Sequence, residues 1–291
     1  MSKNTKLIKA MTINPFQQLA CPLDGLPLSR DGKTWRCESR HSYDIAKQGH
    51  THLLPVQNTR SRNPGDSKEM IDARQRFLDT GLYKPVADAL RKTVFDDLSN
   101  SAAILDAGCG EGYYLRELIS EAKSEQNLDV MGLDISKPAI LSAARQNKSI
   151  NWVIASNANI PVLENTIDRV ICMFGFPVYS EFSRVLKQEG QLIMIESGPN
   201  HLQELREIIY PVVKPQKEKQ ANHEGFRLIS TESLCFTIEL NKRTIIADLL
   251  TMTPHLFRAS AEGKKKASQL ESLSLTVDVR VLRMNLHGIH N

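Results

Sequence analysis

The sequence predicts an α/β protein in which a small N-terminal module precedes a larger domain built on a parallel sheet. From about residue 100 onward, short apolar runs alternate with helical patterns, and this order of elements is typical of a parallel sheet covered by helices. Residues 21–41 carry cysteine, aspartate and histidine near the spacing of a compact metal site. The chain has 291 residues, which is enough for one catalytic domain and one smaller module.

The composition is that of a globular protein without a membrane segment. Hydrophobic residues make up 41% and charged residues 24% of the chain, and no apolar run approaches the roughly 20 residues that cross a bilayer. The five cysteines are scattered, which favours a reducing cytoplasm over a disulfide scaffold. The net charge of +4 is compatible with an anionic partner but does not require one.

Four segments are predicted along the chain. Residues 1–20 lack a continuous apolar core before a cleavage site, so we expect a loose N-terminal extension. Residues 21–57 form the zinc-finger-like module. Residues 58–99 comprise a linker, NTRSRNPGDSKEM, with turn-forming residues, and then a helical stretch broken near Gly81. Residues 100–291 form the larger domain.

The larger domain contains a series of predicted strands. In chain order these are AAILDAG, DVMGLD, NWVIAS, DRVICMF, QLIMIES, LCFTIEL and LTVDVRVLRMNL. The stretches YLRELISEAK and RTIIADLLTMT have helical periodicity. We expect residues 263–269, GKKKASQ, to form a solvated loop.

The N-terminal module carries a metal-site pattern with one unusual residue. The spacing is CxxD, twelve residues, then CxxxH, which selects Cys21, Asp24, Cys37 and His41. Zinc in proteins generally takes four ligands drawn from thiolate, imidazole and carboxylate. Asp24 stands where a second cysteine of a zinc knuckle is expected, so the pattern indicates either a carboxylate-containing zinc site or the remains of one.

A glycine loop follows the first predicted strand of the larger domain. In LDAGCGEG, residues 105–112, the glycines Gly108, Gly110 and Gly112 let a ligand approach the main chain closely. Asp106 precedes the first glycine, and Asp134 ends the second strand. An acid at the end of that strand can accept hydrogen bonds from both ribose hydroxyls of an adenosine.

The acids of this loop decide between two adenosine cofactors. A dinucleotide places its pyrophosphate at the helix N-terminus, where Asp106 and Glu111 would oppose it. S-adenosyl-L-methionine has no phosphate and carries a sulfonium and an amino group, so an acidic loop suits it better. The sequence therefore favours a class I, Rossmann-like methyltransferase over a dehydrogenase.

The third and fourth strands end in residues that suit this cofactor and its substrate. Asn157, in SNANIP after the third strand, lies where such enzymes place the adenine edge. The fourth strand ends in CMFGFPVYSEF, which is not the NPPY-type loop of adenine-N6 methylation, and no cysteine follows Pro or Thr as a cytosine-C5 nucleophile usually does. Phe174 and Phe176 are candidates for stacking on a base, with burial in the core as the alternative.

Several stretches together resemble a known family, the bacterial 23S rRNA (guanine-N1)-methyltransferases of the RlmA (RrmA) type. The resemblance covers nearly the whole chain after residue 20 and both modules in order. It rests on CPLDGLPL, YDIAKQGHTHLLP, TRSRNPGDSKEM, ARQRFLDTGLY, LDAGCGEGYY, GLDISKPAI and SGPNHLQEL.

The resemblance assigns roles to particular residues. It implies that Cys21, Asp24, Cys37 and His41 match the three cysteines and one histidine of the family's zinc module. Asp24 departs from that pattern, and a carboxylate binds structural zinc less tightly than a thiolate does, so retention of the metal is left open. His50 or His52 is an alternative ligand by proximity in sequence. Tyr83 and His201 match positions that contact the methyl donor, beside Gly110 and Glu111 in the loop.

The resemblance also implies a reaction, namely methylation of N1 of a guanine in a hairpin of 23S ribosomal RNA in the cytoplasm. Basic residues of the module and linker could grip phosphates on either side of the target: Arg30, Lys33, Arg36, Arg40, Arg60 and Arg62. The sequence identifies no catalytic base and leaves a homodimer open. Two alternatives remain, a small-molecule methyltransferase of the same fold and a catalytically silent RNA-binding protein.

Overall fold

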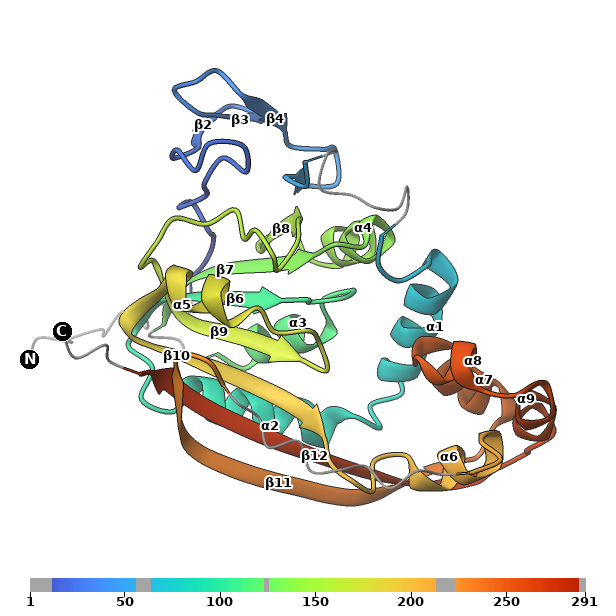
Figure 1. The fold of residues 1–291 in the computed structure, drawn as a ribbon. Helices are drawn as coiled ribbons and strands as arrows, with labels where there is room; N and C mark the ends of the chain where they lie inside the picture. The colour runs from blue at the N-terminus through green and yellow to red at the C-terminus, as the bar shows by residue number, and fades with distance from the viewer. Residues whose placement is uncertain (1–11, 56–63, 123–125, 213–222, 288–291) are drawn as a thin grey trace, which may run out of the picture.

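The computed structural model describes residues 12–55, 64–122, 126–212 and 223–287, and a large mixed sheet forms its centre (Figure 1). Within those ranges the sheet has nine strands, in the order β11-β12-β10-β9-β6-β7-β8-β5, with β1 pairing β7 outside this path. The strands are β1 (Thr12–Pro15), β5 (His50–His52), β6 (Ser101–Ala107), β7 (Asn127–Asp134), β8 (Asn151–Ile154), β9 (Ile167–Met173), β10 (Leu186–Ser197), β11 (Phe226–Leu240) and β12 (Leu273–Leu286).

The strand order places β6 in the middle, between β7 and β9. Neighbouring strands from β10 across to β5 are parallel, whereas β12 pairs antiparallel with both β10 and β11. The chain therefore winds outward from β6 in both directions, and in such sheets ligands bind beyond the carboxyl ends of the strands near this reversal. The seven strands predicted from the sequence are confirmed, as is the parallel α/β architecture.

Two apolar cores lie on the two faces of this sheet. Along β6, Ile104 belongs to one core and Leu105 to the other, as expected for side chains that alternate along a strand. The first core is covered by helices α2 (Lys84–Phe95), α3 (Tyr113–Ser120) and α4 (Lys137–Gln146), and the second by α5 (Tyr179–Val185) and the N-terminal module. The module is thus packed on the sheet.

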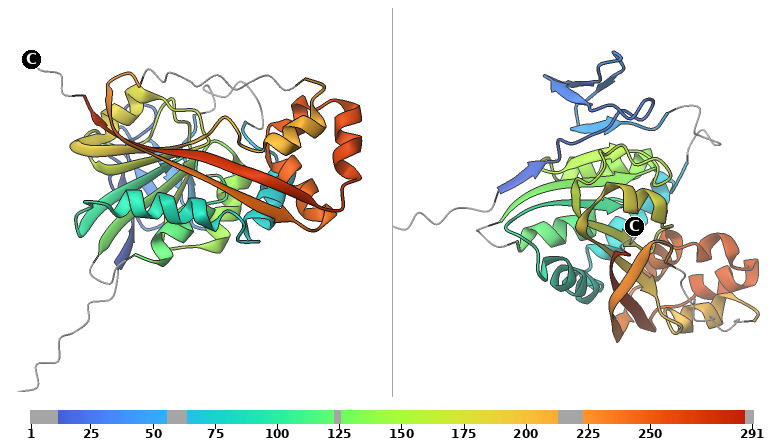
Figure 2. Two further views of the ribbon diagram at one scale, coloured as in Figure 1. Left: turned by 90° about the horizontal axis from the view of Figure 1, so that it is seen from below. Right: turned by 60° about the vertical axis from the view of Figure 1, so that its left-hand side comes forward.

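The N-terminal module has its own small antiparallel sheet. Its strands are β2 (Ser29–Asp31), β3 (Thr34–Arg36) and β4 (Ser42–Asp44). Figure 1 shows these strands above β8 and β7 of the main sheet, and the right-hand view of Figure 2 shows the same arrangement. The amide of Ala20 donates to the carbonyl of Pro161 at 3.0 Å, and that of Leu163 donates to Gln18 at 3.1 Å. These bonds attach the module to the connection that follows β8.

The expectation of a loose extension over residues 1–20 is wrong for its second half. Residues 12–15 form β1, which pairs with β7, and Phe16 and Leu19 are buried. Their apolar side chains cover the sheet face that the parallel strands would otherwise expose. Residues 1–11 lie outside the described residues, as do residues 56–63 of the predicted linker with Arg60 and Arg62.

The predicted helical stretch after the linker is confirmed and consists of α1 (Lys68–Leu78) and α2. The break falls at Gly81, whose φ of 76° favours glycine. In Figure 1, α1 lies beyond the arrowheads of β6 and β7. It packs on α7 (Arg243–Met252), where Arg76 pairs with Asp248 at 2.6 Å.

A group of C-terminal helices completes the fold. They are α6 (Gln203–Ile209), α7, α8 (His255–Arg258) and α9 (Ala261–Ser268), and Figure 2 shows β11 and β12 running from the sheet toward them. The expectation of a solvated loop at residues 263–269 is wrong, because α9 occupies most of it. Ser260 caps this helix by accepting from the amide of Gly263 at 2.9 Å. Within the described ranges, no helix has the length and apolarity to span a membrane.

Candidate functional site

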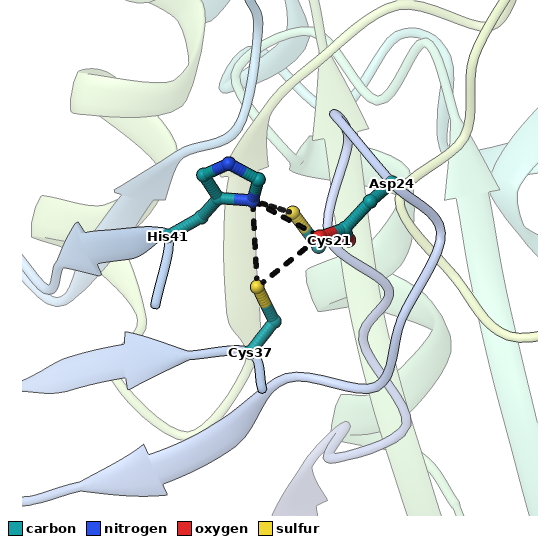
Figure 3. A group of neighbouring side chains, drawn as sticks. All are labelled: Cys21, Asp24, Cys37 and His41. Atoms are coloured by element: carbon teal, nitrogen blue, oxygen red, sulfur yellow. Dashed lines mark hydrogen bonds and ion pairs between the residues drawn. The ribbon is translucent and has the colours of Figure 1, made fainter. Parts of the chain in front are cut away.

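Four side chains of the N-terminal module converge on one point (Figure 3). The potential ligand atoms of Cys21, Asp24, Cys37 and His41 all lie within 4.8 Å of one another. His41 Nδ1 is 3.4 Å from each of the two cysteine sulfurs and 3.1 Å from Asp24 Oδ2. Cys37 Sγ is 3.5 Å from the same Asp24 oxygen.

Two tight turns bring these ligands together. In the first, the amide of Gly25 donates to the carbonyl of Cys21 at 2.8 Å. The amide of Leu26 donates to Asp24 Oδ1 at 3.1 Å, which leaves Oδ2 directed at the other three ligands. In the second turn, the amide of Arg40, whose φ is 66°, donates to the carbonyl of Cys37 at 3.0 Å.

The cluster fits a zinc ion. Zinc–ligand distances of about 2.0–2.3 Å in a tetrahedron place neighbouring ligand atoms about 3.3–3.8 Å apart, close to the four separations of 3.1, 3.4, 3.4 and 3.5 Å given above. Two sulfurs, one nitrogen and one carboxylate oxygen are a suitable donor set for this metal. The hydroxyl of Tyr43 lies 3.2 Å from Cys21 Sγ and could donate to a thiolate. Among the described residues, His50 and His52 do not belong to this group.

The glycine loop closes the carboxyl end of β6. The amides of Gly108 and Cys109 both donate to the carbonyl of Leu133, at 2.8 and 2.9 Å. Gly108 has a φ of 94°, and a Cβ added there would meet only the side-chain nitrogen of Asn157, at 4.0 Å. A Cβ at Gly112 would instead lie 2.4 Å from the ring of Trp152. Gly108 therefore leaves space beside the loop, whereas Gly112 is required by packing.

Asp134 is fixed at the end of β7. Its Oδ2 accepts from the amide of Gly110 at 2.9 Å, and its Oδ1 accepts from the amide of Ser136 at 2.7 Å. Burial raises the pKa of Asp134 above its ordinary value. Each carboxylate oxygen has a second lone pair, so both oxygens remain able to accept hydroxyl groups of a ribose.

Two buried polar atoms beside the loop lack partners among the described residues. They are Asp106 Oδ1 and Asn157 Oδ1. Burial, with the nearby charges of Asp134 and Glu111, raises the pKa of Asp106 to about 8. Unpaired buried polar atoms are uncommon in folded proteins, and these two lie beside the loop that the sequence singled out. They fit a ligand that brings a cation and hydrogen-bond donors.

Glu111 has a structural role that the sequence pattern did not reveal. Its carboxylate accepts from the amide of Tyr113 at 2.8 Å, at the start of α3, and pairs with Arg116 at 3.4 Å. These contacts are made by Oε2 of the carboxylate. Asp106 and Asp134 are therefore the two acids of this region whose carboxyl groups form no ion pair with an arginine among the described residues.

The structure brings Tyr83, His201 and Phe174 together from distant parts of the chain. The rings of Tyr83 and His201 lie 6.4 Å apart edge to face, and Phe174 stacks on His201 at 5.9 Å. Burial lowers the pKa of His201 to about 4, so the ring is neutral at physiological pH. Its Nδ1 accepts from the amide of Asp278 at 3.3 Å, which leaves the proton on Nε2. The hydroxyl of Tyr83 is buried without a described partner.

The loop after β9 exposes two aromatic rings. Phe176 is 90% exposed and Phe174 is 42% exposed, so neither is a core residue. The side-chain nitrogen of Asn157 donates to the carbonyl of Phe176 at 3.4 Å, which connects this loop to the end of the third predicted strand. Phe174 has a φ of 50°, a conformation that costs energy for a bulky residue and is often found at binding sites.

The sequence analysis did not single out Arg74 on α1. Its Nη1 would lie 3.3 Å from a Cβ added at Gly110, so the guanidinium rests against the glycine loop. The only sequence signal is its position in ARQRFLDTGLY, the segment that also carries Tyr83.

Comparison with known proteins assigns both modules. Residues 19–62 match the zinc-ribbon family model described as RlmA, N-terminal. Residues 104–190 match a model described as a methyltransferase domain. The two matches contain the four-ligand cluster and the glycine loop, respectively.

Three relatives are similar over most of their length. The Bacillus subtilis (strain 168) protein named "Putative 23S rRNA (guanine-N(1)-)-methyltransferase YxjB" is 30% identical over 277 residues, which cover 92% of this chain and 96% of the relative. The 23S rRNA (guanine(748)-N(1))-methyltransferase of Streptomyces fradiae is 28% identical, and the match covers 79% of this chain and 83% of the relative. The Micromonospora griseorubida protein named "Putative 23S rRNA (guanine-N(1)-)-methyltransferase" is 31% identical, and the match covers 64% of this chain and 68% of the relative.

Proposed function

The chain belongs to the RlmA-type family of 23S rRNA (guanine-N1)-methyltransferases, and from this premise we propose that it methylates N1 of a guanine in a hairpin of 23S ribosomal RNA. The methyl donor is S-adenosyl-L-methionine, and the reaction takes place in the cytoplasm, where ribosomes are assembled. The observation that carries the proposal is that one chain joins the family's zinc ribbon to a methyltransferase domain in the same order and over nearly the full length of a relative.

The residues at the carboxyl ends of β6, β7 and β8 would hold the cofactor. Asp134 accepts the ribose hydroxyls, and the space at Gly108 allows the cofactor to approach the main chain. Asp106 faces the positive charges of the sulfonium and amino groups. Tyr83 and His201 complete the side of the site formed by α1, α2 and β10. When bound, the cofactor supplies an electrophilic methyl group.

Phe174 and Phe176 would receive the target base. RNA-modifying enzymes take the target out of its stack and hold it between aromatic side chains. Phe176 is almost fully exposed, and Phe174 lies against His201 within the proposed cofactor site. A guanine stacked on these rings is placed near the methyl group. His201, whose pKa is about 4, is a hydrogen-bond donor here and a poor base for the N1 proton.

The zinc ribbon would grip the RNA backbone around the target. Its candidate phosphate-binding side chains are Arg30, Lys33, Arg36 and Arg40, and all four are exposed. Contacts of this kind bind phosphates without reading sequence. The ribbon is fixed to the connection that carries Asn157, because Asn159 Nδ2 donates to the carbonyl of Pro22 at 3.2 Å. The proposed phosphate-binding side chains are therefore held in a fixed position relative to the cofactor.

The experiment that tests the function is mass mapping of ribosomal RNA after incubation with the purified protein and labelled S-adenosyl-L-methionine. We expect one methylguanine in a large-subunit hairpin, with the methyl on N1. Binding of the cofactor without transfer to any RNA would overturn the proposal and favour a small-molecule methyltransferase.

The aromatic platform has its own test in the same assay. We expect Phe176→Ala to lower RNA methylation by about 10-fold or more, because stacking on one base is worth about 1–3 kcal/mol. Phe176→Tyr should retain most activity. Ile229→Ala, which removes another exposed apolar side chain from β11, is the control. Equal activity of Phe176→Ala and wild type would exclude Phe176 from base binding.

A further inference from the structure

We propose that Arg74 binds the carboxylate at the methionine end of the cofactor and thereby selects S-adenosyl-L-methionine over adenosine thioethers and sulfonium compounds that lack it. The inference rests on the proposed function, because it concerns the same cofactor site. It adds a residue on α1, outside both family-model matches.

The position of Arg74 provides the first argument. Helix α1 lies off the carboxyl ends of β6 and β7 (Figure 1), the side of the sheet on which the glycine loop lies. A Cβ added to Gly110 would be 3.3 Å from Arg74 Nη1 and 4.0 Å from its Cδ. Because Gly110 has no side chain, the guanidinium can occupy the space beside this position of the loop.

The hydrogen bonds of the guanidinium provide the second argument. Nη2 donates to Asp66 Oδ2 at 2.5 Å and to the carbonyl of Met252 at 3.2 Å. Among the described residues, Nη1 has no acceptor, and it is the nitrogen that lies against the loop. A guanidinium offers five donors in a planar fork that matches a carboxylate. One part of Arg74 is therefore held in place, and another part is available to a ligand.

Charge complementarity provides the third argument. The cofactor carries a sulfonium, an ammonium and one carboxylate, and Asp106 suits its positive groups. The carboxylate requires a cation. Both terminal nitrogens of Arg116 are directed at Glu111, whereas both hydrogen bonds of Arg74 are made by Nη2, so its Nη1 stays available beside Gly110.

The connection between Arg74 and Asp134 provides the fourth argument. The carbonyl of Asp66 accepts from the hydroxyl of Ser136 at 2.7 Å, and a Cβ added to Gly65 would lie 2.9 Å from that of Ser136. The segment that holds Arg74 is thus packed on the turn that follows Asp134. The proposed ribose acceptor and the proposed carboxylate donor are kept at a fixed separation, which reduces the entropy lost on binding.

The test compares two ligands that differ in one carboxylate. Dissociation constants of S-adenosyl-L-methionine and of its decarboxylated form, S-adenosylmethioninamine, are measured by calorimetry for the wild type, for Arg74→Gln and for Arg76→Gln. Arg76 is the matched control, since it lies on the same helix and pairs with Asp248 on α7. It contacts no residue of the proposed cofactor site among those described.

We expect the wild type to bind S-adenosyl-L-methionine about 10- to 100-fold more tightly than the decarboxylated form, as for a hydrogen bond between charged groups. In Arg74→Gln this ratio should fall to near 1, with the affinity for the decarboxylated form unchanged. Arg76→Gln should keep the wild-type ratio.

A ratio that stays at its wild-type value in Arg74→Gln would overturn the inference, as would an equal loss of affinity for both ligands, which indicates a structural role. Failure of the wild type to bind S-adenosyl-L-methionine at all would instead overturn the proposed function. The two failures are thus distinguished in one series of measurements.

Discussion

The zinc-ligand cluster and the glycine loop each contain an aspartate, and the two environments shift the carboxyl pKa in opposite directions. At Asp24, a hydrogen bond with Cys21 is the largest influence and lowers the pKa of the carboxyl. At Asp106, burial without a partner raises the pKa to about 8. A metal ligand has to be ionised before the metal binds. A carboxyl that receives a cationic cofactor can stay protonated until the cofactor supplies the compensating charge.

The two regions also differ in what holds them together. The central strands β6 and β8 of the main sheet are buried on both faces. In the ribbon, β2 is exposed along its whole length, and the three-stranded sheet with its turns buries only Leu28 and Trp35 among the large side chains described. Small modules with such limited cores commonly depend on a metal for folding. Removal of one ligand should therefore have a larger effect on the ribbon than removal of one cofactor contact has on the sheet.

The largest expected effect comes from removal of zinc. In Cys37→Ser, or after chelation, we expect the zinc content to fall from about one per chain to near zero. Proteolysis should then cleave within residues 19–62, and RNA methylation should fall on the order of 100-fold. Affinity for S-adenosyl-L-methionine should change by less than about 2-fold, because the proposed cofactor contacts lie outside the ribbon. Loss of cofactor affinity together with zinc would show that the two regions fold as one unit.

A pair of glycine substitutions tests the difference in packing. A Cβ at Gly132 would lie 2.3 Å from the ring of Trp152, whereas one at Gly25 meets nothing within 4 Å. We expect Gly132→Ala to lower the free energy of unfolding by about 3 kcal/mol through overpacking. Gly25→Ala should cost only about 1 kcal/mol, from its positive φ. Urea unfolding measures both, and equal losses would contradict the comparison.

The pH dependence of cofactor binding tests Asp106. Because its pKa in the folded protein is about 8 and the cofactor prefers the ionised form, binding releases up to one proton below that pH. Affinity should rise by up to about 10-fold per pH unit toward pH 8 and then level off. Asp106→Asn should bind more weakly and with little pH dependence. Calorimetry in two buffers of different ionisation enthalpy counts the protons released.

The same carboxyl affects stability in a defined direction. Its folded pKa of about 8 lies above the ordinary value of 3.8, so the folded state binds more protons than the unfolded state between these values. Its contribution to the free energy of unfolding is fully present below about pH 4 and is lost as the pH rises to about 8. Asp106→Asn should remove this pH-dependent loss. Between about pH 4 and pH 8, the unfolding free energy of the variant should therefore decrease less than that of the wild type.

The smallest expected effect is a gain at the zinc site. Asp24→Cys replaces the carboxylate by a thiolate, which binds structural zinc more tightly. We expect that about 10-fold more of a competing chelator is needed to remove zinc from Asp24→Cys than from the wild type. RNA methylation should be unchanged. Ser29→Cys, on the exposed strand β2, controls for adding a thiol elsewhere. A weaker site in Asp24→Cys would show that the local geometry is adapted to a carboxylate.

Much of the fold follows from local patterns. Strand runs such as AAILDAG and the break at Gly81 are recognisable because side-chain periodicity and turn chemistry act over a few residues. The four-ligand cluster was also predictable, since the spacing of Cys21, Asp24, Cys37 and His41 is enough to bring them together in two tight turns. The glycine loop and Asp134 were found because they lie at the ends of predicted strands.

Other features depended on contacts between segments distant in sequence. The pairing of Glu111 with Arg116 was not visible in the sequence, and α9 was obscured by a glycine and three lysines. The contact of Arg74 with Gly110 arises only when α1 packs beyond the carboxyl ends of the strands. By itself, the sequence determined which residues have the chemistry for zinc and for a methyl donor. Only the tertiary structure decided which charges are already paired, because pairing depends on packing across the whole chain.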